Sequence, residues 1–217
     1  MDGGDFICGE KELEFLKERD ARLKEVISRV GVIKRRAMPD LFEALVRSIA
    51  AQQISSKAHE TLWNRMLNGI GGISAEKIDA LEIEKLQSFG MSFKKAGYIK
   101  NAAAKIVSGE FDISALRNMD DEKIVETLTS LDGIGVWSAE MLMIFSMRRP
   151  NVLSFGDFAI QRGLRMIYRH RRITRALFEK YRRRFSPYCS AASLYIWEIS
   201  SGKYEGYRDL APKSGKK

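Results

Sequence analysis

The sequence predicts an all-α protein, a two-lobed bundle of short helices that contains a tight hairpin between two of them. Nearly every long segment places its apolar residues at helical spacing, and no stretch alternates apolar and polar residues as a strand would. Glycines and helix-capping residues recur at short intervals, which is typical of short helices joined by tight turns. The 217 residues are enough to bury a sizeable core.

The first half of the chain is expected to form several separate helices, one after another, joined by turns. Apolar periodicity predicts them over residues 13–16, 23–30, 41–49, 56–66 and 96–107. Asp40 stands where it would cap the third of these, and Gly31 and Gly109 where they would end the second and the last. Three further residues mark possible starts of short helices: Ser74, Leu86 and Ser92.

The most informative motif runs from Leu131 to Glu140 and contains Gly133 and Gly135. It separates an apolar-periodic run from a helix-like run that begins at Trp137, so the two glycines indicate a hairpin between helices. The second helix would present its free N–H groups and the positive end of its dipole at the hairpin, where a DNA phosphate can bind. The simpler alternative is an ordinary turn.

Asp157 follows Trp137 by twenty positions and precedes another apolar-periodic run. An aspartate there is most simply a helix N-cap, but capping also holds a carboxylate rigidly and is compatible with catalysis. One carboxylate does not suit phosphodiester hydrolysis, which normally needs metal ions held by several acidic ligands. It does suit a reaction in which positive charge develops on a sugar. The motif therefore favours cleavage of a base-to-sugar bond.

Such a reaction on duplex DNA requires the nucleotide to be flipped out of the stack. The pocket that receives the base should then be aromatic, and a cationic base would also gain cation–π attraction. Candidate pocket residues are Trp137, Met141, Tyr188 and Trp197. Each of them taken singly is more often a core residue.

The charge balance favours a polyanionic partner, because 37 Lys and Arg residues against 28 Asp and Glu give a formal net charge of +9. A basic run extends from Arg169 to Arg184, and a DNA-backbone role for it is left open; Lys94, Lys95 and Lys100 are interpreted as a solvated face rather than a phosphate site. No apolar run could span a bilayer and the amino terminus is acidic, so an intracellular protein that does not bind membrane is expected. Cys8 and Cys189 alone cannot form a disulfide framework or a metal cluster.

At this point the residues carry a family resemblance. The pattern Leu-x-Gly-x-Gly-x-Trp-Ser-Ala from Leu131 to Ala139, with the downstream pair Gly156-Asp157, resembles the helix-hairpin-helix (HhH-GPD) superfamily of DNA glycosylases, specifically the 3-methyladenine DNA glycosylase II type. Segments 39–58 and 188–197 extend the resemblance, which covers roughly residues 20 to 200. It implies one glycosylase unit over residues 1–204, with lobe one at about 41–135 and lobe two from 1–40 plus 136–204, no amino-terminal α/β domain, and a basic flexible tail over 205–217.

The resemblance also implies roles for individual residues. Asp157 becomes the catalytic carboxylate. Residues implied to bind DNA are Gly133, Gly135, Val136 and Ser138 of the hairpin and Gln53, Ile54 and Ser55 of an earlier turn, with Gln53 filling the gap left by the flipped nucleotide. Residues implied to line the base pocket are Trp137, Met141, Tyr188 and Gln52. A monovalent cation at the hairpin would be held by the backbone carbonyls of Thr129, Leu131 and Ile134.

The position of Trp137 predicts the reaction subtype. Bifunctional members of the superfamily carry a lysine there and form a Schiff base, so this chain is expected to be monofunctional and to leave an abasic site. Two cysteines cannot hold an iron–sulfur cluster, and no cofactor is expected. The expected substrates are alkylated purines such as 3-methyladenine and 7-methylguanine in double-stranded DNA, acted on by a monomer. The alternatives are a glycosylase for deaminated or mismatched bases, such as hypoxanthine and uracil, and a non-catalytic DNA-binding module.

Overall fold

The computed structural model describes residues 5–212, which group into two compact units. Residues 38–147 form one unit, and the described residues before and after that range form the other. The sequence placed the second boundary at residue 135, twelve residues too early. The helix after the hairpin belongs with 38–147 because it packs against helices of that unit.

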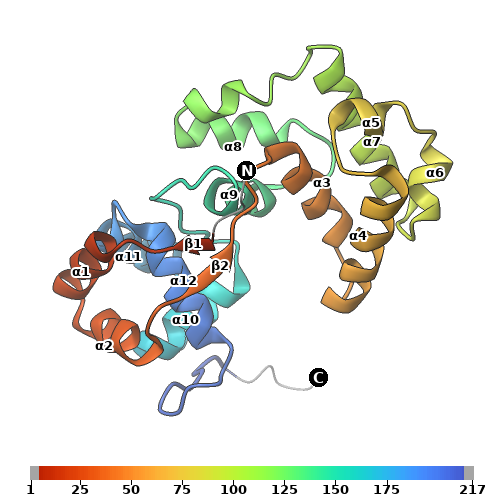
Figure 1. The fold of residues 1–217 in the computed structure, drawn as a ribbon. Helices are drawn as coiled ribbons and strands as arrows, with labels where there is room; N and C mark the ends of the chain where they lie inside the picture. Colours follow the sequence, from red (N-terminus) through yellow and green to blue (C-terminus); the bar gives the residue numbers. More distant parts are fainter. Residues whose placement is uncertain (1–4, 213–217) are drawn as a thin grey trace. The chain divides into compact units, whose positions relative to one another are not determined.

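Unit 38–147 is entirely helical among its regular elements (Figure 1). Its helices are α3 (Leu41–Ala51), α4 (Ser56–Ile70), α5 (Ala75–Asp79), α6 (Ile83–Ser88), α7 (Phe93–Val107), α8 (Asp121–Thr129) and α9 (Val136–Phe145), with a 3-10 helix at Ala115–Asn118. Side chains cap several of them where the sequence predicted: Asp40, Ser74 and Ser92. Leu86 does not begin a helix; it is fully buried inside α6, whose N-cap is Glu82.

The core of this unit is formed by apolar residues at helical spacing. Side chains with almost no exposed surface are Leu45, Ile49, Met66, Ile78, Ile99, Leu116 and Leu128. Helix α7 contacts α3, α5 and α6, and α9 contacts α3 and α8. The hairpin and the α3–α4 turn are thus both anchored in one hydrophobic core.

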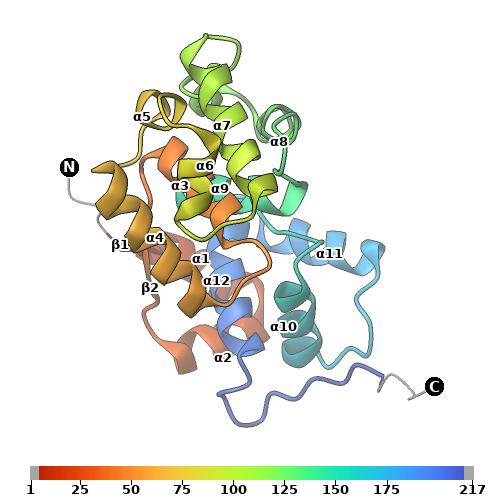
Figure 2. The ribbon, with the colours of Figure 1, turned by 90° about the vertical axis from the view of Figure 1, so that its right-hand side faces the viewer.

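The other unit combines segments from both parts of the chain (Figures 1 and 2). Its elements are β1 (Asp5–Ile7), α1 (Glu10–Arg19), α2 (Ala21–Val30), β2 (Lys34–Arg36), α10 (Phe158–Tyr168), α11 (Arg175–Phe185) and α12 (Cys189–Ser200). The antiparallel pair β1–β2, in which Phe6 lies opposite Arg35, was not predicted, since strands of three residues show no alternation. The prediction of an all-α fold is otherwise confirmed.

Close packing of α10 on α12 is the centre of this unit. A Cβ at Gly163 would lie 2.3 Å from the carbonyl oxygen of Ile196, so only glycine allows the two backbones to approach this closely. Asp20 caps α2 through the Leu23 N–H and forms a 2.7 Å ion pair with Arg184, although Asp20 is only 4% exposed. The first contact packs α10, the helix that Asp157 precedes, on α12, and the second joins α2 to α11.

Residues 205–212 were expected to begin a flexible tail, and the structure contradicts this. Arg165 binds Asp209 through two bonds, Nε to Oδ1 at 2.7 Å and a terminal guanidinium nitrogen to Oδ2 at 2.8 Å. Arg29 donates to the Glu205 carbonyl at 2.6 Å. The remainder of the predicted tail, 213–217, lies outside the described residues. Within 5–212, no helix is long and apolar enough to cross a membrane.

Candidate nucleic-acid site

The predicted hairpin is present between α8 and α9, and its two glycines differ in what they do. Gly133 has φ +82°, and a Cβ there would lie 2.4 Å from the Tyr98 ring, so only glycine fits. Gly135 has φ −93°, and a Cβ added there would meet no atom within 4 Å. Gly133 therefore closes the turn, whereas Gly135 leaves its backbone open to an approaching group.

The amino-terminal end of α9 meets the requirement for an anion site. Gly135 is its N-cap and provides no side-chain acceptor for the N–H groups of the first turn. Val136 and Trp137 beside it are 56% and 48% exposed. Ser138 is only 5% exposed, so the backbone N–H groups of this turn are the more accessible donors for phosphate, and the contact through the Ser138 hydroxyl stays a prediction.

The carbonyls predicted to hold a cation lie in the same hairpin. The Leu131 carbonyl accepts the Ile134 N–H at 3.1 Å, and the Thr129 hydroxyl donates to the Val125 carbonyl at 2.8 Å. A carbonyl oxygen has two lone pairs, so the Leu131 oxygen can still accept an ion. The donor set fits a hard monovalent cation, and the site stays a prediction.

The α3–α4 turn contains the other predicted DNA-binding residues. Gln53 is exposed and has φ +57°, a left-handed conformation that costs a non-glycine residue on the order of 1 kcal/mol. Ile54 is 39% exposed, and the Ser55 hydroxyl caps α4 by accepting from the Ala58 N–H at 3.2 Å. The turn therefore presents Gln53 and Ile54 outward at the cost of backbone strain.

Two side chains fix this turn. The Gln52 amide nitrogen donates to the Gly133 carbonyl at 2.7 Å, which joins the turn to the hairpin. Lys95 Nζ donates to the carbonyls of Ala50, at 3.0 Å, and Gln52. Burial lowers the pKa of Lys95. Lys95 thus stabilises the carboxyl end of α3, and the interpretation of it as a solvated face was wrong.

A cavity of about 360 Å³ lies within unit 38–147, large enough for a small ligand. Its apolar wall is formed by four residues of α9: Trp137, Met141, Leu142 and Phe145. Its more polar wall comes from α3, the turn and α4: Arg47, Ser48, Gln52, Gln53 and His59, with Met38, Ala44 and Ala51 completing the lining. Three of the four pocket residues implied by the resemblance, Gln52, Trp137 and Met141, are therefore brought together, and the candidate Trp197 does not line this cavity.

Tyr188 is the fourth predicted pocket residue and does not line this cavity. It belongs to the other unit, where it is the N-cap residue of α12 and its ring packs edge-on against Phe15 at 5.1 Å.

His59 lines the cavity and was missed by sequence reasoning. Burial, followed by the nearby charges of Arg47 and Lys95, lowers its pKa, so the imidazole is neutral at pH 7. Its Nε2 atom is buried and has no hydrogen-bond partner among the described residues. The Arg47 guanidinium lies 5.3 Å over the Trp63 ring. The sequence around a single histidine on an amphipathic helix does not indicate that the side chain lines a cavity.

Asp157 caps α10 as predicted. Its Oδ1 accepts hydrogen bonds from the N–H groups of Ala159, at 2.7 Å, and Ile160, at 2.9 Å, and the residue is 7% exposed. These bonds hold the carboxylate rigidly at the helix entrance. Phe158 beside it is 88% exposed, so the apolar-periodic run predicted after Asp157 does not bury its first residue.

A family model identifies the superfamily to which the hairpin belongs. The model described as "HhH-GPD superfamily base excision DNA repair protein" matches residues 46–187. The chain belongs to this superfamily. Similar members include DNA-3-methyladenine glycosylase 1 of Schizosaccharomyces pombe, which is 30% identical over 88% of this chain and 86% of that protein.

Solved structures of superfamily members extend the likeness to the whole fold. A DNA-3-methyladenine glycosidase from Bacillus halodurans has a TM-score of 0.83 and 32% identity, covering 95% of this chain and 96% of that chain. A 3-methyladenine DNA glycosylase of Schizosaccharomyces pombe, solved in complex with abasic DNA, has a TM-score of 0.74 and 28% identity, covering 92% and 100%. The predicted superfamily is thereby confirmed.

Proposed function

We propose that this protein is a monofunctional DNA glycosylase that hydrolyses the bond between deoxyribose and an alkylated purine, such as 3-methyladenine or 7-methylguanine, in double-stranded DNA. The observation that carries the proposal is the rigid Asp157 carboxylate at the start of α10, in a chain similar over nearly its whole length to 3-methyladenine glycosylases. Double-stranded DNA as substrate places the reaction inside the cell.

The proposed reaction uses the charge already present on the substrate. An alkylated purine such as 7-methylguanine carries a formal positive charge, so it leaves with the bonding electron pair as a neutral base and needs no added proton. The positive charge moves to the sugar, where the Asp157 carboxylate stabilises it. Water then adds to C1′ and loses a proton, which leaves an abasic site.

The proposed DNA-binding residues would position the duplex and would not recognise its base sequence. Backbone N–H groups at the start of α9 would hold a phosphate, which fixes register but carries no base information. Gln53, held outward by its left-handed backbone, would occupy the gap in the duplex. A base in the 360 Å³ cavity would lie against Trp137, whose ring attracts a cationic purine. A hairpin cation at Leu131 would add charge for the phosphate.

The absence of strand cleavage belongs to the same proposal. Trp137 offers no amine at the start of α9, so no Schiff base can form there. Incubation with a lesion duplex, without heat or alkali, should give free base and an intact strand, and borohydride should trap no covalent adduct. Efficient incision by pure protein would show that another lysine acts as nucleophile. Sedimentation of the protein–DNA complex should show one copy of the chain per lesion.

A second substrate class is favoured by the polar wall of the cavity. The neutral His59 and the Gln52 and Ser48 side chains offer hydrogen bonds to an uncharged base, while the Arg47 charge beside them opposes a cationic one. These residues fit hypoxanthine better than the apolar wall alone would. The same scaffold without catalysis would be a DNA-binding module, for which Asp157 is only a cap.

One experiment separates these functions. The protein is incubated with otherwise identical duplexes that contain 3-methyladenine, 7-methylguanine, hypoxanthine, uracil or a mismatch, and released base is measured by chromatography. Release of the methylated purines ahead of the others is the expected result. Preferential release of hypoxanthine would change the proposed substrate from alkylated purines to deaminated bases. Binding without any base release would leave only the function of a DNA-binding module.

A further inference from the structure

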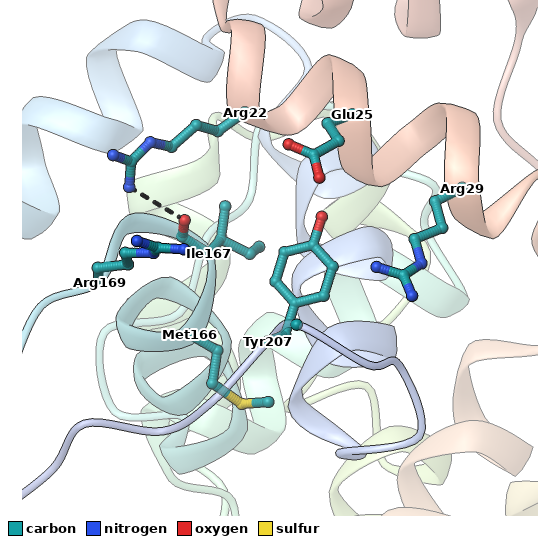
Figure 3. Close-up of a pocket in the computed structure, with 8 residues that line it drawn as sticks. Arg22, Glu25, Arg29, Met166, Ile167, Arg169 and Tyr207 are labelled. Carbon is teal, nitrogen blue, oxygen red and sulfur yellow. Dashed lines mark hydrogen bonds between the residues drawn. The ribbon is translucent and has the colours of Figure 1, made fainter.

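A second cavity, of about 300 Å³, lies in the unit that contains Asp157, and the proposed glycosylase reaction does not use it (Figure 3). It opens at the carboxyl end of α10. Its lining comes from α2, α10 and the segment after α12: Arg22, Glu25, Arg29, Met166, Arg169 and Tyr207, with Ile167 and Gly206. It includes the first arginine of the basic run that the sequence left without a role.

The charges around this cavity are unbalanced, since three guanidinium groups face one carboxylate. Figure 3 shows Arg22 and Arg169 on the same side, whereas Glu25 points toward the Tyr207 hydroxyl. Arg29 lies 5.6 Å over the Tyr207 ring and donates to the Glu205 carbonyl. The Arg22 and Arg169 side therefore has no carboxylate between its two positive groups.

Arg22 has a structural role that Arg169 lacks. A terminal nitrogen of Arg22 donates to the Ile167 carbonyl at 3.2 Å, which satisfies one of the last carbonyls of α10. The backbone N–H of Arg169 donates to the Arg165 carbonyl, but its guanidinium makes no hydrogen bond or ion pair within residues 5–212. Burial lowers the pKa of the neighbouring His170, and the positive charges of Arg22 and Lys180 lower it further. Two other cationic side chains therefore lie near the residue that follows Arg169.

The backbone conformation of Arg169 is evidence that its side chain has a role. It ends α10 with φ 59° and ψ 40°, the left-handed conformation that glycine adopts freely at this position. A residue with a Cβ pays on the order of 1 kcal/mol there. A guanidinium is therefore held in this cavity where glycine would serve the fold better, which points to a role for the side chain itself.

We propose that this cavity binds a phosphate group between Arg22 and Arg169. Guanidinium groups match phosphate oxygens in paired, charge-assisted hydrogen bonds, and two of them on one wall suit an anion with more than one oxygen to share. Met166 and the Tyr207 ring form an apolar surface for the remainder of the ligand. The phosphate belongs either to the DNA backbone outside the lesion or to a free phosphate ester.

This site is separate from the catalytic carboxylate. Asp157 is the N-cap of α10 and Arg169 its C-cap, and the 11 helical residues between them, at about 1.5 Å per residue step, separate the two by about 18 Å. The inference consequently does not rest on the proposed function and can be tested on protein without a lesion substrate.

The variant Arg169→Gly tests the proposal without harming the fold, because glycine relieves the left-handed residue. Thermal unfolding is followed in potassium phosphate and in potassium chloride of equal ionic strength, at one pH. A ligand bound only by the folded state raises the Tm, so phosphate should raise it for the wild type. Arg171→Gln, which removes the same charge from the same basic run outside the cavity, should keep the gain. Arg169→Gly and Arg169→Asn should show a smaller gain, since only phosphate bound elsewhere, as at the start of α9, still contributes, and neither should have a lower Tm in chloride.

Binding to an undamaged duplex at several salt concentrations identifies the source of the phosphate. The slope of log K against log salt is negative, and one lost backbone contact makes it less steep by about 0.9. A less steep slope for Arg169→Gly than for Arg171→Gln assigns the site to DNA. Equal slopes with a reduced phosphate gain assign it to a free phosphate ester. Two results together overturn the proposal. In the first, Arg169→Gly keeps the phosphate gain of the wild type, or the wild type shows no gain. In the second, the salt slope of Arg169→Gly equals that of Arg171→Gln.

Discussion

The side-chain amide of Gln52 donates a 2.7 Å hydrogen bond to the carbonyl oxygen of Gly133 and thereby joins the two elements expected to hold DNA. One is the α3–α4 turn, which presents Gln53, and the other is the hairpin before α9. Lys95 fixes the same turn from the side of α3. Both bonds lie within unit 38–147, so the turn and the hairpin act as one rigid surface.

Replacing Gln52 should impair excision more than it impairs folding. Gln52→Ala removes one hydrogen bond, which lowers the free energy of unfolding by about 1 kcal/mol. Because the turn then loses its fixed position at the hairpin, base release under single-turnover conditions should fall by about tenfold or more. Gln52→Glu should fall at least as far, since a carboxylate opposes the Gly133 carbonyl. Equal excision by wild type and Gln52→Ala would show that the bond is only structural.

The two hairpin glycines should respond differently to alanine. Gly133→Ala introduces a Cβ 2.4 Å from the Tyr98 ring at positive φ and should lower the free energy of unfolding by about 1–3 kcal/mol. Gly135→Ala meets open space, so it should cost less than about 1 kcal/mol but weaken DNA binding, because its methyl group stands where a phosphate would approach. Urea unfolding and duplex binding of both variants give the comparison. A stable Gly133→Ala would contradict it.

Gln53 offers a way to separate strain from function. Gln53→Gly should leave the free energy of unfolding within about 1 kcal/mol of wild type, since glycine accepts φ +57°. If the side chain fills the gap in the duplex, this variant should bind undamaged DNA as wild type does yet flip the target base less often. Fluorescence of 2-aminopurine opposite or beside the lesion reports that step. Undiminished fluorescence change with Gln53→Gly would move the plug to another residue, with Ile54 next.

The two histidines predict a fall in stability below neutral pH. Their pKa values are lowered in the folded state from 6.5, mainly by burial. The unfolded chain then binds protons first as pH falls, so a contribution that is complete above pH 6.5 is lost as pH falls through the lower folded pKa. The free energy of unfolding should decrease from pH 6.5 toward about pH 5. His59→Ala should make that decrease shallower, and an unchanged slope would show that His59 does not contribute.

Structural features that depend on a few consecutive residues, such as helix caps and the hairpin, were predicted from the sequence. An aspartate before an apolar-periodic run specifies a helix cap within four residues, and Asp40 and Asp157 both cap helices as predicted. The Gly133 and Gly135 spacing predicted the hairpin for the same reason. Residues 34–36 and 5–7 pair across a long separation, so their short strands left no pattern to find.

Contacts between distant segments account for the remaining errors. Helix α9 is apolar on nearly every face, so its sequence could not show that Ser138 points inward and Trp137 outward. His59 enters the cavity only because α4 packs on α3, and Lys95 meets the end of α3 only through the position of α7. Tyr188, which the resemblance groups with Trp137, lies in the other unit, and its place in the base pocket stays a prediction.

Single-turnover release of 7-methylguanine by Asp157→Asn tests the central claim most directly. Asparagine retains the capping oxygen, so the fold and DNA binding should persist, and Asp40→Asn, the same change at the cap of α3, controls for any effect of capping. The account predicts that Asp157→Asn loses on the order of 100-fold or more in rate while Asp40→Asn stays near wild type. Base release by Asp157→Asn at the wild-type rate would contradict it.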